Sequence, residues 1–497
     1  MPDRTSARRG TAIVIGGGMT GMLAAAVLAD HAEVTVIERD VLPDGPAPRK
    51  GLPQARHAHL LWSGGAKAIE HLLPGVLDRL VAHGARRVPI MSGMVSKAPS
   101  GQWFRRFNHA HHVNVVCSRD LLDDTIRAEV LSRKGVTLRE RTEPVALTGT
   151  AGRVTGVRVR PVGGDLGKDG NQSRDQGQDQ GRNQGAEESL TADLVIDASG
   201  RGSRAPHWLA ELGHPPVHER VVDAGVRYAS RIYEAPASAG DNFPIVNVQA
   251  DPRQPPGRGG VILPIEDGPS ESGASKTRRW LVTLSGTRGG EPTGDNDDFV
   301  PFTRSLPHRV IADLLADAHP LTDVVTTRST ANIRRYYEKM TDWPAGFAVL
   351  GDAVAGYNPV YGHGLTAAAQ SAVALQDVLR EHGPDGPGTA RRIQRAAARP
   401  VGRAWDLAVG QDIFYPGASE QPPTPLEKVF ATFIDRAVDT GARNPHALRA
   451  LLDVMSMERP PTRLLRPDMV LRVFFGRKLP LLDGPPLTEA ERTALSA

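Results

Sequence analysis

Three glycines near the start of the chain have the spacing of a dinucleotide-binding turn. Gly16, Gly18 and Gly21 follow a short apolar run and open a second one. Gly16 permits a tight turn, Gly18 leaves room for a diphosphate, and Gly21 lets the next helix pack close to the preceding strand. Glu38 stands about twenty residues beyond Gly16, where a carboxylate accepts hydrogen bonds from the hydroxyls of an adenosine ribose. This pattern predicts dinucleotide binding and leaves FAD and NAD as alternatives.

A second glycine-containing stretch lies far along the chain. Asp352 follows a buried apolar run, and Pro359, Gly362 and Gly364 come shortly after it. Because the two glycines carry no side chain, the N-terminus of the helix predicted to start at Leu365 is open to negative charge. Two such helix ends in one chain indicate a long ligand.

The segment Arg49–His59 is a further candidate site, because it is dense in polar residues and lies beside the first motif. It ends on His57-x-His59, a spacing that occurs in metal sites. No carboxylate or cysteine partner stands nearby, so a metal is not predicted. The alternative is a solvated loop that only carries charge.

The elements that position these residues alternate between strands and helices. Thr11–Ile15 is predicted to be a buried strand, Met22–Ala29 a buried helix and Val34–Ile37 a second strand. Further strands are predicted at Val113–Val116, Val136–Leu138, Val145–Leu147, Val154–Arg160, Leu194–Ile196 and in the run before Gly351, and further helices at Asp120–Arg133 and Leu365–Leu379.

The middle of the chain has a different pattern, with longer strands separated by turn residues. Predicted strands there are Trp103–Phe107, Gly225–Tyr233, Ile245–Ala250, Gly260–Pro264, Trp280–Leu284 and Val324–Tyr337, with one amphipathic helical stretch at Asp297–Ala318. This part is therefore expected to form a second domain rich in antiparallel sheet.

Composition excludes several classes of protein. The formal charge is +4, and basic residues are dispersed among acidic ones, so nucleic acid is not an expected partner. Cys117 is the one cysteine, which excludes an internal disulfide framework, and no signal peptide precedes the first strand. No apolar run reaches the roughly 18 residues of a transmembrane segment. A cytoplasmic location is expected.

The motifs, taken in order, resemble those of the para-hydroxybenzoate-hydroxylase-like flavoprotein monooxygenases. The resemblance rests on the first glycine motif with Glu38, on the turn Asp197–Ser203, and on Gly351–Gly364. Arg49–Trp62, Asp193–Arg204 and Gly351–Gly364 are also similar to the bacterial polyene epoxidases of polyether-ionophore pathways, of the monensin and lasalocid type. The resemblance runs from about Thr11 to Arg380, and it favours FAD over NAD.

The resemblance implies roles for individual residues. Glu38 would hold the adenosine ribose, Arg119 the pyrophosphate, Asp352 the ribityl chain, and the Gly362–Leu365 turn the pyrimidine edge of the flavin. The full set of residues expected at the cofactor is Gly16, Gly18, Met19, Thr20, Gly21, Glu38, Arg39, Arg49, Arg119, Asp352, Pro359, Gly362, Gly364 and Leu365. Ser199-Gly200 stands where the related aromatic hydroxylases carry Asp-Gly, and the Trp-x-Trp-x-Ile-Pro run of flavin halogenases is absent.

The fold implied is α/β, with a Rossmann-type FAD-binding domain, an inserted antiparallel-sheet substrate domain and a helical C-terminal region. Residues 1–85, 113–215 and 331–383 are assigned to the FAD-binding domain, 86–112 and 216–330 to the substrate domain, and 384–497 to a helical C-terminal cap. Residues 163–189 are mostly Gly, Gln, Asp and Asn, which predicts a disordered hairpin insertion.

The reaction implied is monooxygenation. NAD(P)H reduces FAD, molecular oxygen gives a flavin hydroperoxide, and one oxygen atom passes to a double bond of an unsaturated polyketide, free or carrier-bound. His57 and His363 are candidates for donating a proton to the peroxide; otherwise they are ordinary polar loop residues. The alternatives are an aromatic hydroxylase, a flavin-dependent reductase and a non-catalytic flavin-bearing binding protein. The substrate cavity is expected between the flavin and the antiparallel sheet, lined by Gln54, Trp103, Phe107, Val246, Val248, Leu263 and Trp280.

Overall fold

A five-stranded parallel sheet carries the first glycine motif. The computed structural model describes residues 10–163, 186–251, 254–269 and 276–495. The strand order is β18-β10-β1-β2-β6, and every neighbouring pair is parallel. The strands are β1 (Gly10–Ile15), β2 (Ala32–Ile37), β6 (Val136–Arg139), β10 (Leu194–Asp197) and β18 (Phe347–Val349). The apolar residues of β18, β10, β1 and β2 are buried because other layers cover both faces of the sheet, whereas the edge strand β6 is partly exposed.

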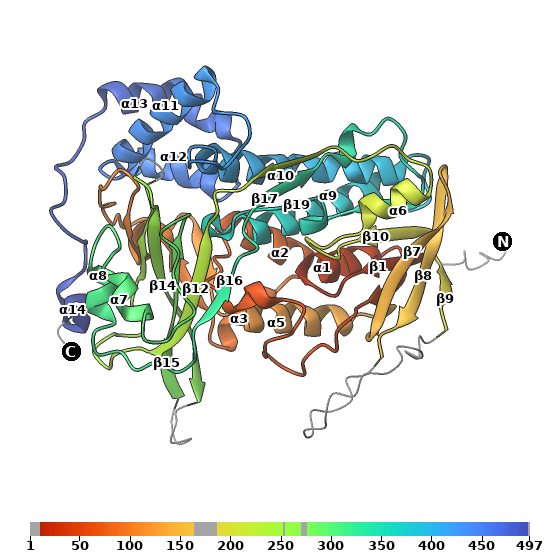
Figure 1. Cartoon of the computed structure of the whole chain (residues 1–497), viewed down its shortest axis with the longest axis horizontal. Helices are drawn as coiled ribbons and strands as arrows, with labels where there is room; N and C mark the ends of the chain where they lie inside the picture. The colour runs from red at the N-terminus through yellow and green to blue at the C-terminus, as the bar shows by residue number, and fades with distance from the viewer. Residues whose placement is uncertain (1–9, 164–185, 252–253, 270–275, 496–497) are drawn as a thin grey trace, which may run out of the picture.

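One face of this sheet is covered by helices and the other by a small antiparallel meander (Figure 1). The helices are α1 (Met19–Leu28), α2 (Ser63–Leu72), α3 (Val76–Ala82), α5 (Arg119–Leu131) and α9 (Gly364–His382). The meander consists of β7 (Thr142–Thr150), β8 (Arg153–Pro161) and β9 (Glu188–Thr191), and it packs with α6 (Ala205–Glu211). Nearly every residue of α1 is buried, as its apolar sequence predicts.

A six-stranded sheet forms the second layer system, in the order β16-β12-β15-β14-β13-β4. Its strands are β4 (Met94–Lys97), β12 (Arg227–Glu234), β13 (Ile245–Val248), β14 (Arg258–Pro269), β15 (Lys276–Gly286) and β16 (Val325–Thr327). All neighbouring pairs are antiparallel except β13 with β4. The short helices α7 (Phe299–Thr303) and α8 (Val310–Leu314) share a core with one face of this sheet.

Smaller elements join the two sheets. The pair β3 (Arg86–Pro89) and β5 (Val113–Val116) is antiparallel, and β11 (Glu219–Val222), β17 (Asn332–Arg335) and β19 (Ala355–Gly356) form a three-stranded sheet. The short helices are α4 (Ile90–Gly93) and the 3-10 turns η1 (Pro53–Arg56), η2 (Tyr337–Lys339), η3 (Gly351–Ala353), η4 (Pro359–Tyr361), η5 (Pro461–Leu465) and η6 (Thr493–Leu495).

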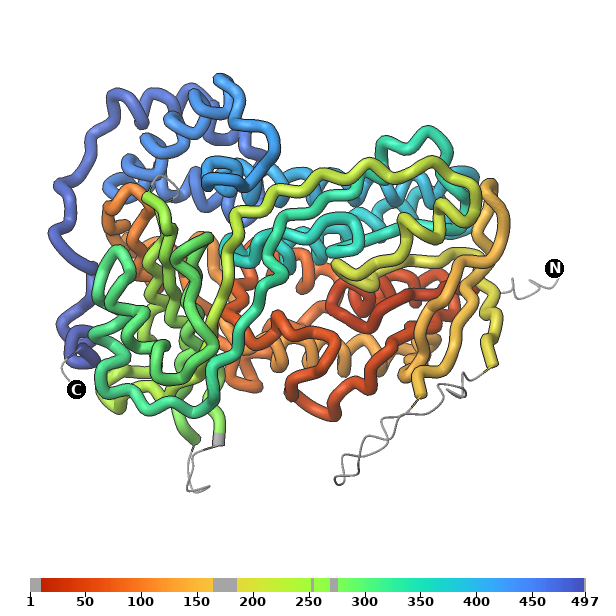
Figure 2. Tube along the Cα trace, in the orientation of Figure 1, coloured from red at the N-terminus to blue at the C-terminus, as the bar shows by residue number. Residues whose placement is uncertain are grey.

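The C-terminal region is helical and lies across both parts. The long helix α10 (Thr389–Asp412) packs along α9. Next, α11 (Pro425–Gly441), α12 (Pro445–Met455) and α13 (Pro467–Phe475) gather above the six-stranded sheet (Figure 1). The chain then runs down the outside of the molecule to α14 (Glu489–Arg492), beside α7 and α8 (Figure 2). None of the helices within the described ranges is long and apolar enough to cross a membrane.

The predicted fold class is confirmed: a Rossmann-type parallel sheet, additional antiparallel sheets and C-terminal helices are all present. The predicted domain boundaries stay a prediction. Within the predicted insertion 163–189, residues 164–185 lie outside the described residues, and Glu188 and Ser189 belong to β9, which pairs with β8.

Three predicted elements are wrong in detail. The stretch Asp297–Ala318 forms α7 and α8 rather than one helix, and Pro307 stands between them, where its missing N–H ends a helix. Val324–Tyr337 is divided into β16 and β17. Trp103–Phe107 is not a strand, since only Trp103 makes an isolated bridge, to Lys97.

Candidate functional site

The first glycine motif forms a tight turn between β1 and α1. Gly16 has a φ of 101°, and a Cβ there would lie 2.6 Å from the carbonyl oxygen of Ala198. A Cβ on Gly21 would lie 1.8 Å from the carbonyl oxygen of Gly16. At Gly18 the nearest atom to an added Cβ is Nη2 of Arg49, at 3.4 Å. Gly16 and Gly21 are therefore required by packing, whereas Gly18 keeps a surface clear in front of the helix.

The N-terminus of α1 is prepared for an anion. No side chain caps it, and its first turn holds no acidic residue. The guanidinium of Arg49 lies over the turn, with Nη1 3.4 Å from both the carbonyl oxygen of Gly17 and a carboxylate oxygen of Glu38. Its Nε is buried and finds no hydrogen-bond partner among the described residues. Free N–H groups, the helix dipole and this cation fit a diphosphate.

Glu38 ends β2 beside the same turn. Its carboxylate accepts hydrogen bonds from the N–H groups of Gly17 at 2.8 Å and Asp40 at 3.0 Å. A carboxylate has about four acceptor positions, so some remain for ribose hydroxyls. Arg39 differs from the other predicted cofactor residues: its side chain is 60% exposed and lies 3.9 Å from Asp40.

The third motif lies directly against the first. Gly351 has a φ of 63°, and a Cβ there would lie 2.4 Å from Oγ1 of Thr20. Asp352 follows in η3 and is half-buried, and no residue in the described part of the chain donates a hydrogen bond to its carboxylate. Burial raises the pKa of the Asp352 carboxyl above its usual value, and the guanidinium groups of Arg201 and Arg119 oppose that shift. A carboxylate that receives no hydrogen bond from the described residues fits the hydroxyls of a ribityl chain.

Other predicted cofactor residues lie around these motifs. Arg119 begins α5, is buried, and donates from Nε to Asp123 at 2.7 Å. Met19 and Leu365 are buried in the core that α1 and α9 share. Asp197 of the second motif accepts hydrogen bonds from Ser199 and Ser203, which fixes the turn that packs against Gly16.

The turn from Pro359 to Gly364 opens α9. Gly362 has a φ of 68°, and Nε1 of Trp62 donates to the carbonyl oxygen of Tyr361 at 3.1 Å. No side chain caps α9, and its first turn holds no acidic residue. Its N-terminus therefore presents positive potential next to the turn.

A buried carboxylate that sequence reasoning missed holds this turn in place. Asp412, at the end of α10, accepts hydrogen bonds from Asn332 at 2.7 Å, Asn358 at 2.9 Å and the hydroxyl of Tyr361 at 2.6 Å. Tyr228 donates to Asn358 at 2.6 Å. These residues come from four distant segments, so the one signal in the sequence was the position of Asn358 directly before Pro359.

A cavity of about 870 Å³ begins at this turn. Its walls are the Pro359–Gly362 turn, the segment from His57 to Leu60, one face of the six-stranded sheet, and helices α10, α11 and α12. The apolar residues that line it include Met91, Ile245, Val261, Leu263, Phe414, Leu448 and Leu452. It is therefore a mainly apolar chamber between the two predicted domains and the C-terminal helices.

The predicted substrate residues divide between the two faces of the sheet. Leu263 lines the cavity. Val248, at the end of β13, borders the cavity, but its side chain packs in the same core as Val246. Val246, Trp103 and Trp280 do not line the cavity, because they pack in the core on the opposite face with α7 and α8. Alternate residues of a strand face opposite sides, and the sequence alone did not show which side was open. Gln54 lies in η1, and Phe107 packs at the edge of the hydrophobic cluster that contains Leu263 and Leu452. Neither Gln54 nor Phe107 lines the cavity.

The two candidate histidines differ in what they can donate. Burial lowers the pKa of both to about 4, so both are neutral near pH 7. Nε2 of His363 lies 3.1 Å from the carbonyl oxygen of Met455, which can only accept, so Nδ1 of His363 carries no proton. His57 lines the cavity; its Nδ1 lies 2.8 Å from Oγ of Ser230, and its Nε2 has no partner. Of the two, only His57 has a ring nitrogen available to donate.

A buried ionic cluster ties α12 and the residues after it to the rest of the molecule. Nε2 of His112 lies 3.0 Å from Asp453, and Nδ1 lies 3.4 Å from Glu458, which also accepts from Ser63 at 2.6 Å. Burial by itself lowers the pKa of His112, but the two carboxylates raise it above its usual value overall. The His112 ring in turn lowers the pKa of Glu458.

We expect the stabilisation from His112 to depend on pH. Since its folded pKa is raised, its contribution is complete below the unfolded value of about 6.5 and is lost as pH rises through the folded pKa. Urea unfolding should show the largest difference between wild type and His112→Leu near pH 6 and a smaller difference at pH 9. The exposed His446→Leu is the control. A difference that stays constant with pH would contradict a charged His112.

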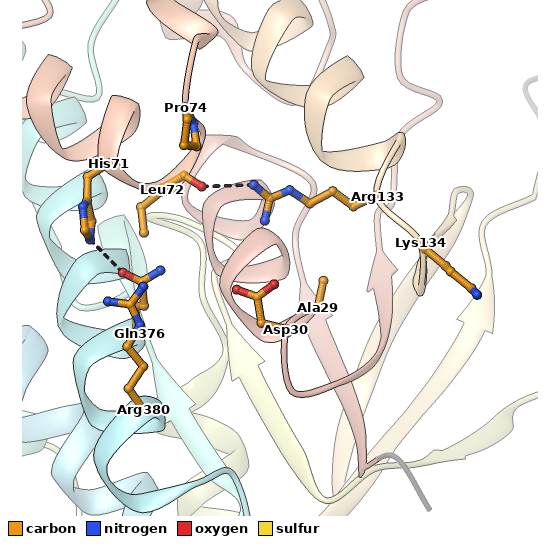
Figure 3. A pocket seen from close by; sticks show the side chains of 9 residues that line it. All are labelled: Ala29, Asp30, His71, Leu72, Pro74, Arg133, Lys134, Gln376 and Arg380. Atoms are coloured by element: carbon orange, nitrogen blue, oxygen red, sulfur yellow. Dashed lines mark hydrogen bonds between the residues drawn. The ribbon is translucent and has the colours of Figure 1, made fainter. Parts of the chain in front are cut away.

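A second pocket, of about 530 Å³, lies at the opposite end of α1 and is polar (Figure 3). Two of its basic groups are engaged: Arg133 donates to the carbonyl oxygens of Ala26 and Leu72, and His71 pairs with Gln376. Over the described residues, no group of three or more His, Cys, Asp or Glu is placed to hold a metal ion.

Comparison with known proteins identifies the family. No family model matches the chain. Protein Rv3254 of Mycobacterium tuberculosis (strain ATCC 25618 / H37Rv) is 32% identical over 452 residues, which cover 88% of each chain. The chain belongs to the Rv3254 family. Membership in this family does not by itself assign an activity to the chain, because the name of the relative states none.

Solved structures show the fold of this Rv3254-family chain. The flavin-dependent brominase Bmp2 has a TM-score of 0.58 at 14% identity, over 90% of this chain and 93% of that one. PqsL, a probable FAD-dependent monooxygenase from Pseudomonas aeruginosa, has a TM-score of 0.58 at 16% identity, over 86% of this chain and 99% of that one. The p-nitrophenol 4-monooxygenase PnpA from Pseudomonas putida DLL-E4 has a TM-score of 0.57 at 14% identity, over 90% of this chain and 98% of that one. The Rv3254-family chain therefore has a fold found in flavin-dependent monooxygenases and halogenases.

Proposed function

We propose that this protein is an FAD-dependent monooxygenase that epoxidises double bonds of a linear unsaturated polyketide in polyether biosynthesis, with NAD(P)H as reductant and molecular oxygen as co-substrate. The observation that carries the proposal is the apolar cavity of about 870 Å³ that begins at the Pro359–Gly362 turn. When bound, FAD supplies the activation and transfer of oxygen. The protein supplies binding, orientation and a dry chamber.

The chain's own groups are suited to hold the dinucleotide. Arg49 and the N-terminus of α1 would bind the diphosphate, Glu38 the adenosine ribose and Asp352 the ribityl chain. Arg119 is proposed on the resemblance, beside Asp352. The N-terminus of α9 would place positive potential at the pyrimidine edge, where negative charge develops on reduction.

The cavity favours a long apolar substrate over a small phenol. Its volume lies within the range of pockets that enclose drug-sized ligands, and its wall is mainly aliphatic and aromatic. A phenol hydroxylase also needs a base to take the phenolic proton. His57, the candidate best placed to meet a ligand, is a weak base because burial lowers its pKa to about 4, and Ser230 engages its Nδ1.

We propose that Nε2–H of His57 donates a hydrogen bond into the cavity. The N–H of Ala58 donates to Oγ1 of Thr283 at 2.8 Å, Thr283 lies 2.6 Å from Ser230, and Ser230 lies 2.8 Å from Nδ1 of His57. If the hydroxyl of Thr283 donates to Ser230 and the hydroxyl of Ser230 donates to Nδ1 of His57, then Nδ1 is an acceptor and the ring hydrogen is on Nε2. The relay would thus set the tautomer that faces the ligand.

His57→Leu should keep FAD and lower product formation by roughly 100-fold, the lower range for removing one hydrogen-bond donor that faces developing charge. Oxidation of NAD(P)H should continue and release hydrogen peroxide in place of product. His363→Leu is the comparison, since its only N–H is bound by Met455. Normal product yield from His57→Leu would remove His57 from the mechanism.

The function is tested by turnover on a panel of linear polyenes and phenols. The proposal expects a polyene to stimulate NAD(P)H oxidation and to gain the mass of one oxygen atom per event. Turnover of phenols alone would establish the aromatic hydroxylase instead. Saturation of double bonds without oxygen uptake would indicate a reductase, and no substrate-stimulated oxidation would indicate a binding protein.

A further inference from the structure

Apolar side chains on the outside of α11 and α13 form one continuous exposed surface. On α11 they recur at the spacing of a single helix face, and on α13 they do the same. The rings of Phe433 and Phe474 join the two faces, with centroids 6.5 Å apart. We name this surface the α11–α13 stripe; it comprises the exposed residues Leu426, Val429, Phe430, Leu471, Phe474 and Phe475, with the partly buried Phe433 between the two helices.

The exposure of the stripe is unusual for this molecule. Leu426 is 78% exposed, Val429 68% and Phe475 84%. Outside residues 426–481, the large hydrophobic side chains that are exposed in the described part of the chain are all valines: Val41, Val81, Val221 and Val360. Exposed aromatic and leucine side chains gathered in one place mark a surface that another partner covers.

Positive charge surrounds the stripe. Its cationic neighbours in sequence are Lys428, Arg436, Arg472, Arg477 and Lys478. The guanidinium of Arg436 lies 5.5 Å from the ring centroid of Phe474. Four carboxylates, Glu427, Asp435, Asp439 and Asp468, lie near these cations in sequence. Asp468 is paired with Arg463 at 3.4 Å, and Glu427 is held in a capping box with Thr424. A second copy would bring like charges together, whereas an anionic surface would neutralise them.

The inner side of α11 faces the cavity. Ala431, Ile434 and Val438 line it, and Phe430 belongs both to the lining and to the stripe. The residues of α11 that are fully buried lie only towards its C-terminal end, at Ala437, Thr440 and Gly441. The N-terminal half of α11 is therefore a single-helix wall between the cavity and the stripe.

We propose that the α11–α13 stripe docks on the surface of an anionic lipid bilayer. Helices with aromatic and leucine side chains on one side and Lys or Arg beside them bind in the plane of the membrane interface. An apolar substrate dissolved in the bilayer would then reach the cavity beneath α11. The proposal that the stripe docks on a bilayer does not depend on the proposed function. Only the route by which an apolar substrate enters the cavity rests on the proposed function.

The test is co-sedimentation of the full chain with vesicles of phosphatidylcholine alone and of phosphatidylcholine with phosphatidylglycerol. We expect binding to the mixed vesicles that weakens at high salt. The double variant L471S/F475S should lower binding at least about tenfold, because it removes two large apolar groups from the interface. R477E/K478E should lower binding to the anionic vesicles specifically.

The matched control is V81S/V221S, which removes exposed apolar groups elsewhere and should bind as wild type does. Unchanged thermal melting of L471S/F475S would show that the fold is intact, as expected for exposed positions. The proposal would be overturned if the wild-type protein bound neither the phosphatidylcholine vesicles nor the mixed vesicles. A dimer in solution that L471S/F475S converts to a monomer would also overturn it, because the stripe would then be covered by a second copy. Neither result bears on oxygen transfer, so the proposed function would stand or fall separately.

Discussion

Replacing Asp352 with alanine should release most of the FAD from a protein that remains folded. The wild-type chain is expected to purify yellow, with one FAD per chain. The Asp352 carboxylate has no donor among the described residues, so its hydrogen bonds are available to the ribityl hydroxyls. A hydrogen bond to a charged group contributes about 1.5–3 kcal/mol, which corresponds to a loss of roughly 10-fold to 150-fold in affinity. Equilibrium dialysis with flavin fluorescence measures the change.

The controls for Asp352→Ala separate loss of the cofactor from loss of the fold. Asp352→Asn keeps one acceptor oxygen and should bind FAD with intermediate affinity. Asp385→Ala changes an exposed aspartate and should leave affinity unchanged. Full retention of FAD by Asp352→Ala would remove Asp352 from the site.

Asp412→Ala should give the largest loss of stability. The carboxylate is buried and accepts from Asn332, Asn358 and Tyr361. Its removal leaves the amide of Asn358 and the hydroxyl of Tyr361 without this acceptor, while Asn332 keeps the carbonyl oxygen of Val222. We expect the free energy of unfolding to fall by about 3 kcal/mol or more. Because the same network holds the Pro359–Gly362 turn, the residual folded protein should also bind FAD more weakly.

Urea unfolding of three proteins tests this prediction. Asp412→Asn retains one acceptor and should be destabilised less than Asp412→Ala. Asp377→Ala, on the exposed side of α9, should change stability by no more than about 0.5 kcal/mol, as is usual for surface positions. Equal stability of Asp412→Ala and Asp377→Ala would show that the network does not support the turn.

Local sequence was sufficient to predict the nucleotide-binding half of the fold. Gly16, Gly18 and Gly21 lie within one strand–turn–helix unit, and Glu38 follows at the end of the next strand. The physical requirements of such a unit are short-range: φ at Gly16, close approach at Gly21 and an open helix end. The same reasoning applies to Gly362 and α9.

The substrate side was less predictable because its contacts are long-range. Val246 and Leu263 are both apolar strand residues in the sequence, but α7 and α8 cover the face that Val246 occupies, whereas Leu263 lines the cavity. The C-terminal helices had no motif, yet α10 contributes Asp412 and α11 a wall of the cavity. Pairings such as His112 with Asp453 span hundreds of residues and leave no local pattern.

The most direct test of the account is turnover of a linear polyene under isotopically labelled oxygen gas. The account predicts one labelled atom from the gas for each epoxide, with one NAD(P)H consumed per event. Label that arrives from water, or a product that gains hydrogen without oxygen, would contradict it.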